Sequence, residues 1–209
     1  RDSFIVLDLP ATMTPPELPS GSWAVEHHTR QSALHPNEDP VDAWPSTRRK
    51  QLRRAEREGM ATDQTDDLDL LVHLHQAARD RKGLKSDARG LRALLEQLLK
   101  EPDTHAWAVR NASGHVLAGG VFHGTGDGRC VYGFGGQFRT EEPGESSRAS
   151  VLLIATAMRH AATLGASPFD FGGSRDAGVD RFYSEFGAER VPKWRLVRIQ
   201  GLWKPILRW

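Results

Sequence analysis

Four basic residues recur along one face of a helix expected between Ser46 and Glu58. Positions three, four and seven apart share a helix face, and here they are Lys50, Arg53, Arg54 and Arg57. Four aligned cations can hold the phosphate groups of a nucleic acid or of a nucleotide-linked ligand. An ordinary solvated face, moderated by neighbouring glutamates, is the competing interpretation.

A glycine turn follows a short buried strand expected at residues 168–171. Open α/β sheets place ligands at the carboxyl ends of their strands, so Gly172, Gly173 and Ser174 are candidate substrate contacts. A plain connecting turn explains the same residues. Asp170, at the end of the strand, is a candidate general base, and a buried, hydrogen-bonded structural aspartate is the alternative.

Metal chemistry has little support in the sequence. The single cysteine, Cys130, lies in an expected strand and suits a small core residue. Nine histidines show no ligand spacing, and His73 and His75 point to different faces of one expected helix. We therefore predict no metal.

Composition indicates a cytoplasmic protein of one or two domains, and the order of its expected strands and helices indicates an α/β fold. The 209 residues carry 28 Lys and Arg against 27 Asp and Glu, so no global field attracts nucleic acid or membrane. One cysteine permits no intrachain disulfide, and no apolar run reaches the roughly 20 residues of a membrane span. The first residue is Arg1 rather than Met, which leaves a preceding half-domain open.

Periodicity and turn residues predict the elements that must position these groups. A strand is expected from Ser3 to Leu9, and an extended connection from Pro10 to Pro45, where seven of the twelve prolines fall. Ser46 is expected to cap the basic helix. Further strands are expected at 60–65, 105–110, 116–124, 129–138, 168–171 and 191–199, and helices at 67–81, 87–100, 147–164 and 179–186. We predict an N-terminal part at 1–59 and a main domain at 60–209.

This order of elements, together with three local strings, resembles the GNAT superfamily in its FemAB-like variant. The strings are FDFGGSRDAGVDRFYSEFGAE at 169–189, STRRKQLRRAEREGM at 46–60, and the FY-x-x-F-G segment at 182–187. The resemblance implies a mixed, mostly antiparallel sheet flanked by helices. It also implies that the strand ending near Phe138 splays from the strand at 168–171.

Transfer of an acyl or aminoacyl group to an amine is the activity that this resemblance implies. It places a general-acid tyrosine at Tyr183. A phenol with a pKa near about 10 can protonate a departing thiolate at little cost, whereas FemAB-like users of aminoacyl-tRNA tend to have lysine there. Tyr183 thus favours a thioester donor. Packing without chemistry on the apolar face of a short helix is the alternative.

The resemblance also directs attention to the segment from Arg139 to Ser147 as a phosphate-binding loop and helix start. Here the run QFRTEEPGESS departs from the family's glycine pattern and adds three glutamates. The candidate donor contacts are Phe138, Arg139, Gly144, Ser146 and Arg148. An ordinary polar loop is the competing interpretation.

Two classes of function follow. The first is an N-acyltransferase that uses acetyl-CoA or another acyl-CoA and a small-molecule or peptide amine as acceptor. The alternative enzyme is an aminoacyl-tRNA-dependent transferase, which the cationic helix favours. The second class is a non-catalytic binding module on the same fold. The acceptor, the acyl length and the oligomeric state are left open.

Overall fold

The strands form one mixed sheet in the part of the chain that the structure describes. This computed structural model describes residues 3–10, 13–173 and 176–200. The eight described strands lie in the order β1-β8-β2-β7-β6-β5-β4-β3. Their bounds are β1 Ser3–Asp8, β2 Ser22–Ser32, β3 Ala61–Gln64, β4 Thr104–Arg110, β5 Val116–Gly124, β6 Cys130–Gln137, β7 Phe169–Asp170 and β8 Glu189–Gln200. All neighbours pair antiparallel except β6 and β7, which run parallel.

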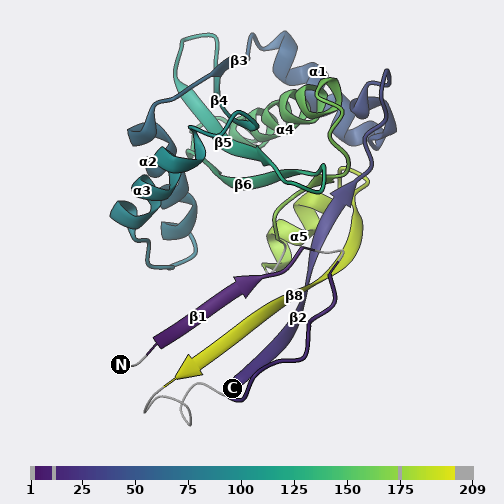
Figure 1. Cartoon of the computed structure of the whole chain (residues 1–209). Coiled ribbons are helices and arrows are strands. Elements are labelled where there is room, and N and C mark those ends of the chain that lie inside the picture. Colours follow the sequence, from purple (N-terminus) through teal and green to yellow (C-terminus); the bar gives the residue numbers. More distant parts are fainter. Residues whose placement is uncertain (1–2, 11–12, 174–175, 201–209) are drawn as a thin grey trace.

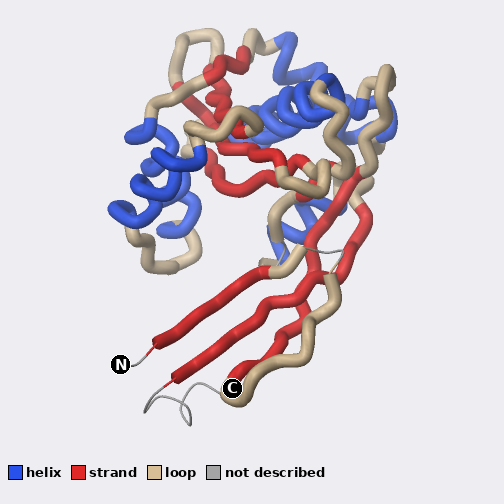
Figure 2. The backbone as a smooth tube through the Cα atoms, in the orientation of Figure 1, coloured by secondary structure: helices blue, strands red, loops and turns tan. Residues whose placement is uncertain are grey.

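Helices cover both faces of the part of the sheet from β3 to β6 (Figure 1). The described helices are η1 Pro40–Ala43, α1 Ser46–Arg57, α2 Leu68–Asp80, α3 Ala88–Leu98, α4 Glu145–Thr163 and α5 Ala177–Ser184. Helix α4 lies on one face, and α2, backed by α3, lies on the other. By contrast, β1, β8 and β2 extend away from this body as a three-stranded arm (Figure 2).

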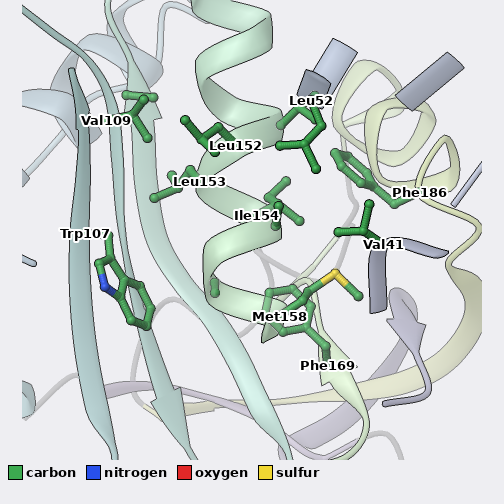
Figure 3. Packing of buried hydrophobic residues seen from close by; sticks show 14 of the residues in the cluster. Val41, Leu52, Trp107, Val109, Leu152, Leu153, Ile154, Met158, Phe169 and Phe186 are labelled. Carbon is green, nitrogen blue, oxygen red and sulfur yellow. The ribbon is translucent and has the colours of Figure 1, made fainter. Parts of the chain in front are cut away.

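The main core surrounds α4. Its residues Leu153, Ile154 and Met158 are buried between the sheet and the segment that contains α1 (Figure 3). Trp44 packs edge-on against Phe186 at a centroid distance of 4.8 Å. Because α4 is covered by the sheet on one side and by α1 and η1 on the other, its apolar residues extend around most of its surface.

The opposite face carries a smaller core. Leu71, Leu91 and Leu95 from α2 and α3 pack onto Val121 of the sheet. Helix α2 approaches the sheet closely because two strand residues lack side chains. A Cβ on Gly136 would lie 2.0 Å from the carbonyl oxygen of Leu74, and one on Gly119 would lie 2.8 Å from the Leu74 side chain.

The expected α/β architecture and the order of elements are confirmed, with two local corrections. The connection expected from Pro10 to Pro45 contains the eleven-residue strand β2, which pairs with β8 from Ser22 opposite Arg198 to Gln31 opposite Glu189. No proline falls between Pro19 and Pro36, so nothing prevents a ladder there. Helix α1 takes Pro45 as its N-cap residue, so Ser46 is the first helical residue and not the cap.

Residues before position 59 contribute β1, β2 and α1 to the same sheet and core. The boundary expected at residue 59 stays a prediction. Among the described helices, none is long and apolar enough to cross a bilayer.

Candidate active site

The site lies where β6 and β7 separate. These parallel strands pair only at Cys130 with Phe169 and at Val131 with Asp170. From Tyr132 to Gln137, this edge of β6 pairs with no described strand. The splay expected from the family resemblance is therefore present, and it begins inside β6 and not past Phe138.

Local backbone geometry explains the separation. The register between β5 and β6 shifts, with Val121 opposite Phe134 and Phe122 opposite Tyr132, which leaves Gly133 as an extra residue on β6. Such a bulge bends a strand and increases its twist. On β7, the chain leaves the sheet at Gly172, which has a φ of 82°, and a Cβ there would lie 2.2 Å from the carbonyl oxygen of Tyr132.

Two adjoining cavities occupy the opening. The larger, of about 520 Å³, lies along β6 between α4, α5 and the end of α2. The smaller, of about 240 Å³, is lined by aromatic rings and by the backbone of Gly133, Gly172 and Gly173. Four residues belong to the walls of both cavities: His75, Tyr132, Gly135 and Tyr183. Groups bound in the two cavities would meet at these residues.

Tyr183, the proton donor expected from the family resemblance, lies in the wall of both cavities. It lies on α5, and its half-buried ring packs on Phe171 and faces Tyr132, at centroid distances of 4.7 and 6.3 Å. Burial, with a smaller contribution from Tyr132, raises the pKa of the Tyr183 phenol. The group therefore carries its proton at neutral pH and remains a candidate acid.

Three charged contacts that the sequence analysis missed hold α5 in place. Arg30 of β2 donates two hydrogen bonds to the Asp180 carboxylate, at 2.8 and 2.9 Å. Buried Arg48 of α1 pairs with Glu185 and stacks over Phe182 at 4.6 Å. Arg48 shares the spacing of the buried residues Leu52 and Ala55, so its inward direction was readable from the sequence.

Asp170 has the contacts of a structural carboxylate. Its oxygens accept from Thr29 Oγ1 at 2.5 Å, Gln31 Nε2 at 2.9 Å, Arg129 Nη1 at 3.0 Å and the Gly172 amide at 2.8 Å. The side chain is buried and lines neither cavity. Four donors occupy the lone pairs that a base would need. The geometry favours the structural alternative over the candidate base.

Side chains of the expected donor loop are engaged in hydrogen bonds within the loop and with Glu58. Buried Arg148 donates to Glu58 and Glu142, each at 2.7 Å, and Ser146 donates to the Phe138 carbonyl at 2.6 Å. None of the five expected contacts lies in the wall of either cavity: Phe138, Arg139, Gly144, Ser146 and Arg148. Ser147 and Ser150 of α4 line the larger cavity instead. The pairing with Arg148 also neutralises one of the glutamates that would oppose an anionic ligand.

The four expected cations of α1 do share an exposed face, but they line neither cavity: Lys50, Arg53, Arg54 and Arg57. Arg54 is paired with Glu58 at 2.6 Å. Other cations, from the end of α2, reach the wall of the larger cavity. They are Arg79, Arg81 and Lys82. The sequence signal for them was the cluster of basic residues at the end of the expected helix 67–81.

The end of α2 closes over the opening through polar contacts. Arg81 donates to the Gln137 carbonyl at the end of β6. Lys82 pairs with Asp176, the N-cap residue of α5, at 3.3 Å. Of the expected turn contacts, Gly172 and Gly173 line the smaller cavity, where Lys193 donates to the Gly172 carbonyl at 3.0 Å. Ser174 lies outside the described residues.

A mixed sheet with a bulge in β6 and a splay between β6 and β7 is the arrangement of the GNAT fold. A family model described as acetyltransferase (GNAT) domain matches residues 46–184. The chain therefore belongs to this family. No curated protein matches the chain.

Solved structures show the same fold at low identity. FemX is 15% identical, with a TM-score of 0.69 over 86% of this chain and 63% of its own. The C-terminal domain of a putative lysylphosphatidylglycerol synthetase from Agrobacterium fabrum is 14% identical, with a TM-score of 0.57 over 88% and 64%. An N-acetyltransferase from Kribbella flavida is 18% identical, with a TM-score of 0.50 over 88% and 62%. This chain thus spans less than two thirds of the length of each.

Proposed function

We propose that the chain transfers an acyl group from an acyl-coenzyme A thioester to the amine of a small molecule or peptide. The observation that carries this proposal is the position of Tyr183 in the wall shared by two cavities at the opening between β6 and β7. A donor in the larger cavity and an acceptor in the smaller one would place the reacting atoms beside its phenol.

The larger cavity suits an anionic donor. Its wall presents Arg79, Arg81 and Lys82, and the carboxylate of Asp176 offsets one of these charges. Ser147 and Ser150 add hydroxyl groups from the first turns of α4. Phosphate groups bind well to such combinations of cations and donors at the start of a helix.

The chemistry is an addition followed by loss of a thiolate. The acceptor nitrogen attacks the thioester carbonyl carbon and forms the C–N bond. The C–S bond then breaks, and the departing sulfur takes the phenolic proton of Tyr183. Because burial destabilises both the phenolate and the free thiolate, proton transfer is expected to accompany C–S cleavage.

Substitution of Tyr183 by Phe tests this role. General acids contribute about 100-fold to 10,000-fold, so we expect kcat to fall at least about 100-fold while the donor Kd stays unchanged. Tyr132→Phe is the matched comparison, because Tyr132 also lines both cavities but its hydroxyl lies against Gly135. Equal turnover of Tyr183→Phe and wild type would refute the acid role.

Donor binding is tested separately by thermal unfolding. A donor at 100 times its Kd adds about 2.7 kcal/mol to the free energy of unfolding. In a chain of this size, Tm should rise by roughly 5 to 10 °C. No shift with any acyl-coenzyme A would contradict the proposed donor.

Transfer from aminoacyl-tRNA is the second candidate, and the exposed cationic face of α1 favours it. If tRNA binds there, replacing Arg53 and Arg57 by Gln should reduce tRNA affinity and flatten its dependence on salt. The same double variant should leave turnover with acyl-coenzyme A unchanged. A tRNA-dependent reaction that is insensitive to this change would remove the argument for the helix.

A further inference from the structure

Acylation of an amine also needs a group that accepts the proton released by nitrogen, and few described groups of the two cavities can do so. The described side chains with a basic site there are His75 and Asp176. Asp176 caps α5 by accepting from the Val179 amide at 2.9 Å and pairs with Lys82 at 3.3 Å. Both contacts stabilise its ionised form and lower its pKa, which makes it a weak base.

His75 has the geometry that Asp176 lacks. It belongs to the walls of both cavities, as Tyr183 does. Its ring packs edge-on against Phe134 of β6 at 5.8 Å, and no hydrogen bond joins either ring nitrogen to another described residue. The close seating of α2 on Gly136, beside the Leu74 carbonyl, fixes the helix that carries it. The imidazole is therefore held in position with its nitrogens available.

The smaller cavity favours an uncharged amine. Its described walls are aromatic rings, His75 and peptide groups, and they contain no carboxylate. An ammonium group transferred into such surroundings loses hydration without gaining a counter-ion, which lowers its pKa. The acceptor would thus react as a neutral amine, and a neutral base is sufficient to take its proton.

We propose that His75 is the general base of the reaction and that it acts opposite the acid Tyr183. This proposal rests on the proposed acyl transfer. As the amine nitrogen forms its bond to the acyl carbon, one N–H proton passes to a ring nitrogen of His75. The leaving thiolate receives the phenolic proton of Tyr183, and the imidazolium returns its proton through solvent to the phenolate. An ester donor would require the same base.

The charges around His75 keep its imidazole neutral. Burial is the main cause that lowers its pKa below 6.5, and Arg79 one turn away adds to the effect. The other charged or titratable groups in the cavity walls are Arg81 and Lys82 from the end of α2, Tyr132 from β6, and Tyr183 and Asp176 from α5. Arg81 and Lys82 add positive charge to the same walls, the two protonated phenols are uncharged, and the single carboxylate is already paired.

The experiment compares His75→Gln with His73→Gln. His73 lies two residues earlier on the same helix, is exposed and lines neither cavity. The rate constant kcat is measured from pH 5 to 9 at saturating donor and acceptor, once with acetyl-CoA and once with an aminoacyl-tRNA. We expect His75→Gln to lose at least about 100-fold in kcat and the acidic limb of the profile. His73→Gln should retain both, and donor Kd should not change in either.

Chemical rescue separates a base from a structural residue. In His75→Ala, added imidazole should restore part of kcat, which a loss of packing would not allow. Failure of rescue, or a His75→Gln profile equal to that of His73→Gln, would overturn the role of His75 alone. Absence of turnover by the wild-type chain with both donors would overturn the acyl transfer and the base together.

Discussion

The two halves of the sheet that meet at β6 and β7 are stabilised in different ways. On the β6 side, strands β3 to β6 are packed between α4 and the pair α2 and α3 (Figure 1). On the β7 side, the arm leaves Ile5 and Leu7 more than half exposed. The ion pair of Asp8 with Arg195 joins β1 to β8, and the ion pair of Arg30 with Asp180 joins β2 to α5. Strands β3 to β6 thus depend mainly on apolar packing on both faces, whereas the arm also relies on ion pairs.

This difference explains why an opening can exist. The halves are joined by a parallel ladder of two residue pairs and by the polar network around Asp170. The bulge at Gly133 and the turn at Gly172 end that ladder and leave the space beside Tyr132 open. The candidate site thus lies between the strands packed by apolar residues and the arm that is held by ion pairs. The following substitutions test that division.

The largest effect on stability is expected from Asp170→Asn at the junction. The change removes the buried one of the two carboxylates that balance Arg129, whose Nη1 lies 3.0 Å from it. Breaking a buried pair by removing one partner costs about 3 to 5 kcal/mol. Urea denaturation should show a loss in that range.

Asp127→Asn is the matched control for Asp170→Asn. Asp127 also pairs with Arg129 at 3.0 Å, but its side chain is 39% exposed. Exposed pairs contribute about 0 to 1 kcal/mol, so this variant should lose little. Equal losses from the two variants would show that burial does not decide the strength of the junction.

A smaller loss is expected from Gly136→Ala, which tests the packed half. Its Cβ would meet the backbone of Leu74 at 2.0 Å, so α2 must move away from the sheet. Overpacking of this kind costs roughly 1 to 3 kcal/mol. Gly126→Ala is the control, because nothing lies within 4 Å of a Cβ there. If both variants unfold at the same urea concentration, close seating of α2 does not stabilise the body.

Local pattern was sufficient to predict most of the fold. The apolar periodicity of 67–81 and 87–100 corresponds to α2 and α3, because each segment buries the face that its own spacing defines. Turn-forming residues on either side of 116–124 correspond to the ends of β5, which is buried along most of its length. Strand β2 escaped prediction because the residues of its ladder partner, β8, lie 158 to 176 positions away along the chain. Prolines on both sides of β2 made the whole region resemble a connection, although β2 itself contains no proline.

The candidate site was predictable only in part. Tyr183 lies in a string that resembles a family motif, so its position could be inferred. His75, Arg81 and Lys82 reach the opening because α2 seats on Gly119 and Gly136 and its end passes the free edge of β6. That approach depends on tertiary packing, which no spacing within residues 67–85 encodes.

The smallest of these losses in stability is expected from Asp180→Asn, which tests the charged half. Arg30 lowers the pKa of Asp180 from 3.8 to about 2, and the carboxylate is 21% exposed. The shift corresponds to roughly 2 kcal/mol before solvent screening, so we expect a loss of about 1 to 2 kcal/mol. Because the folded pKa is depressed, this stability is fully present above about pH 4 and is lost as pH falls toward 2.

Urea denaturation at pH 7 and at pH 3 should therefore show a difference between wild type and Asp180→Asn that shrinks at the lower pH. Substitution of exposed Asp66 by Asn is the control and should show no such difference. A loss that stays constant from pH 7 to pH 3 would mean that Asp180 positions α5 through its shape and hydrogen bonds, and that charge does not hold the arm to the helix of Tyr183.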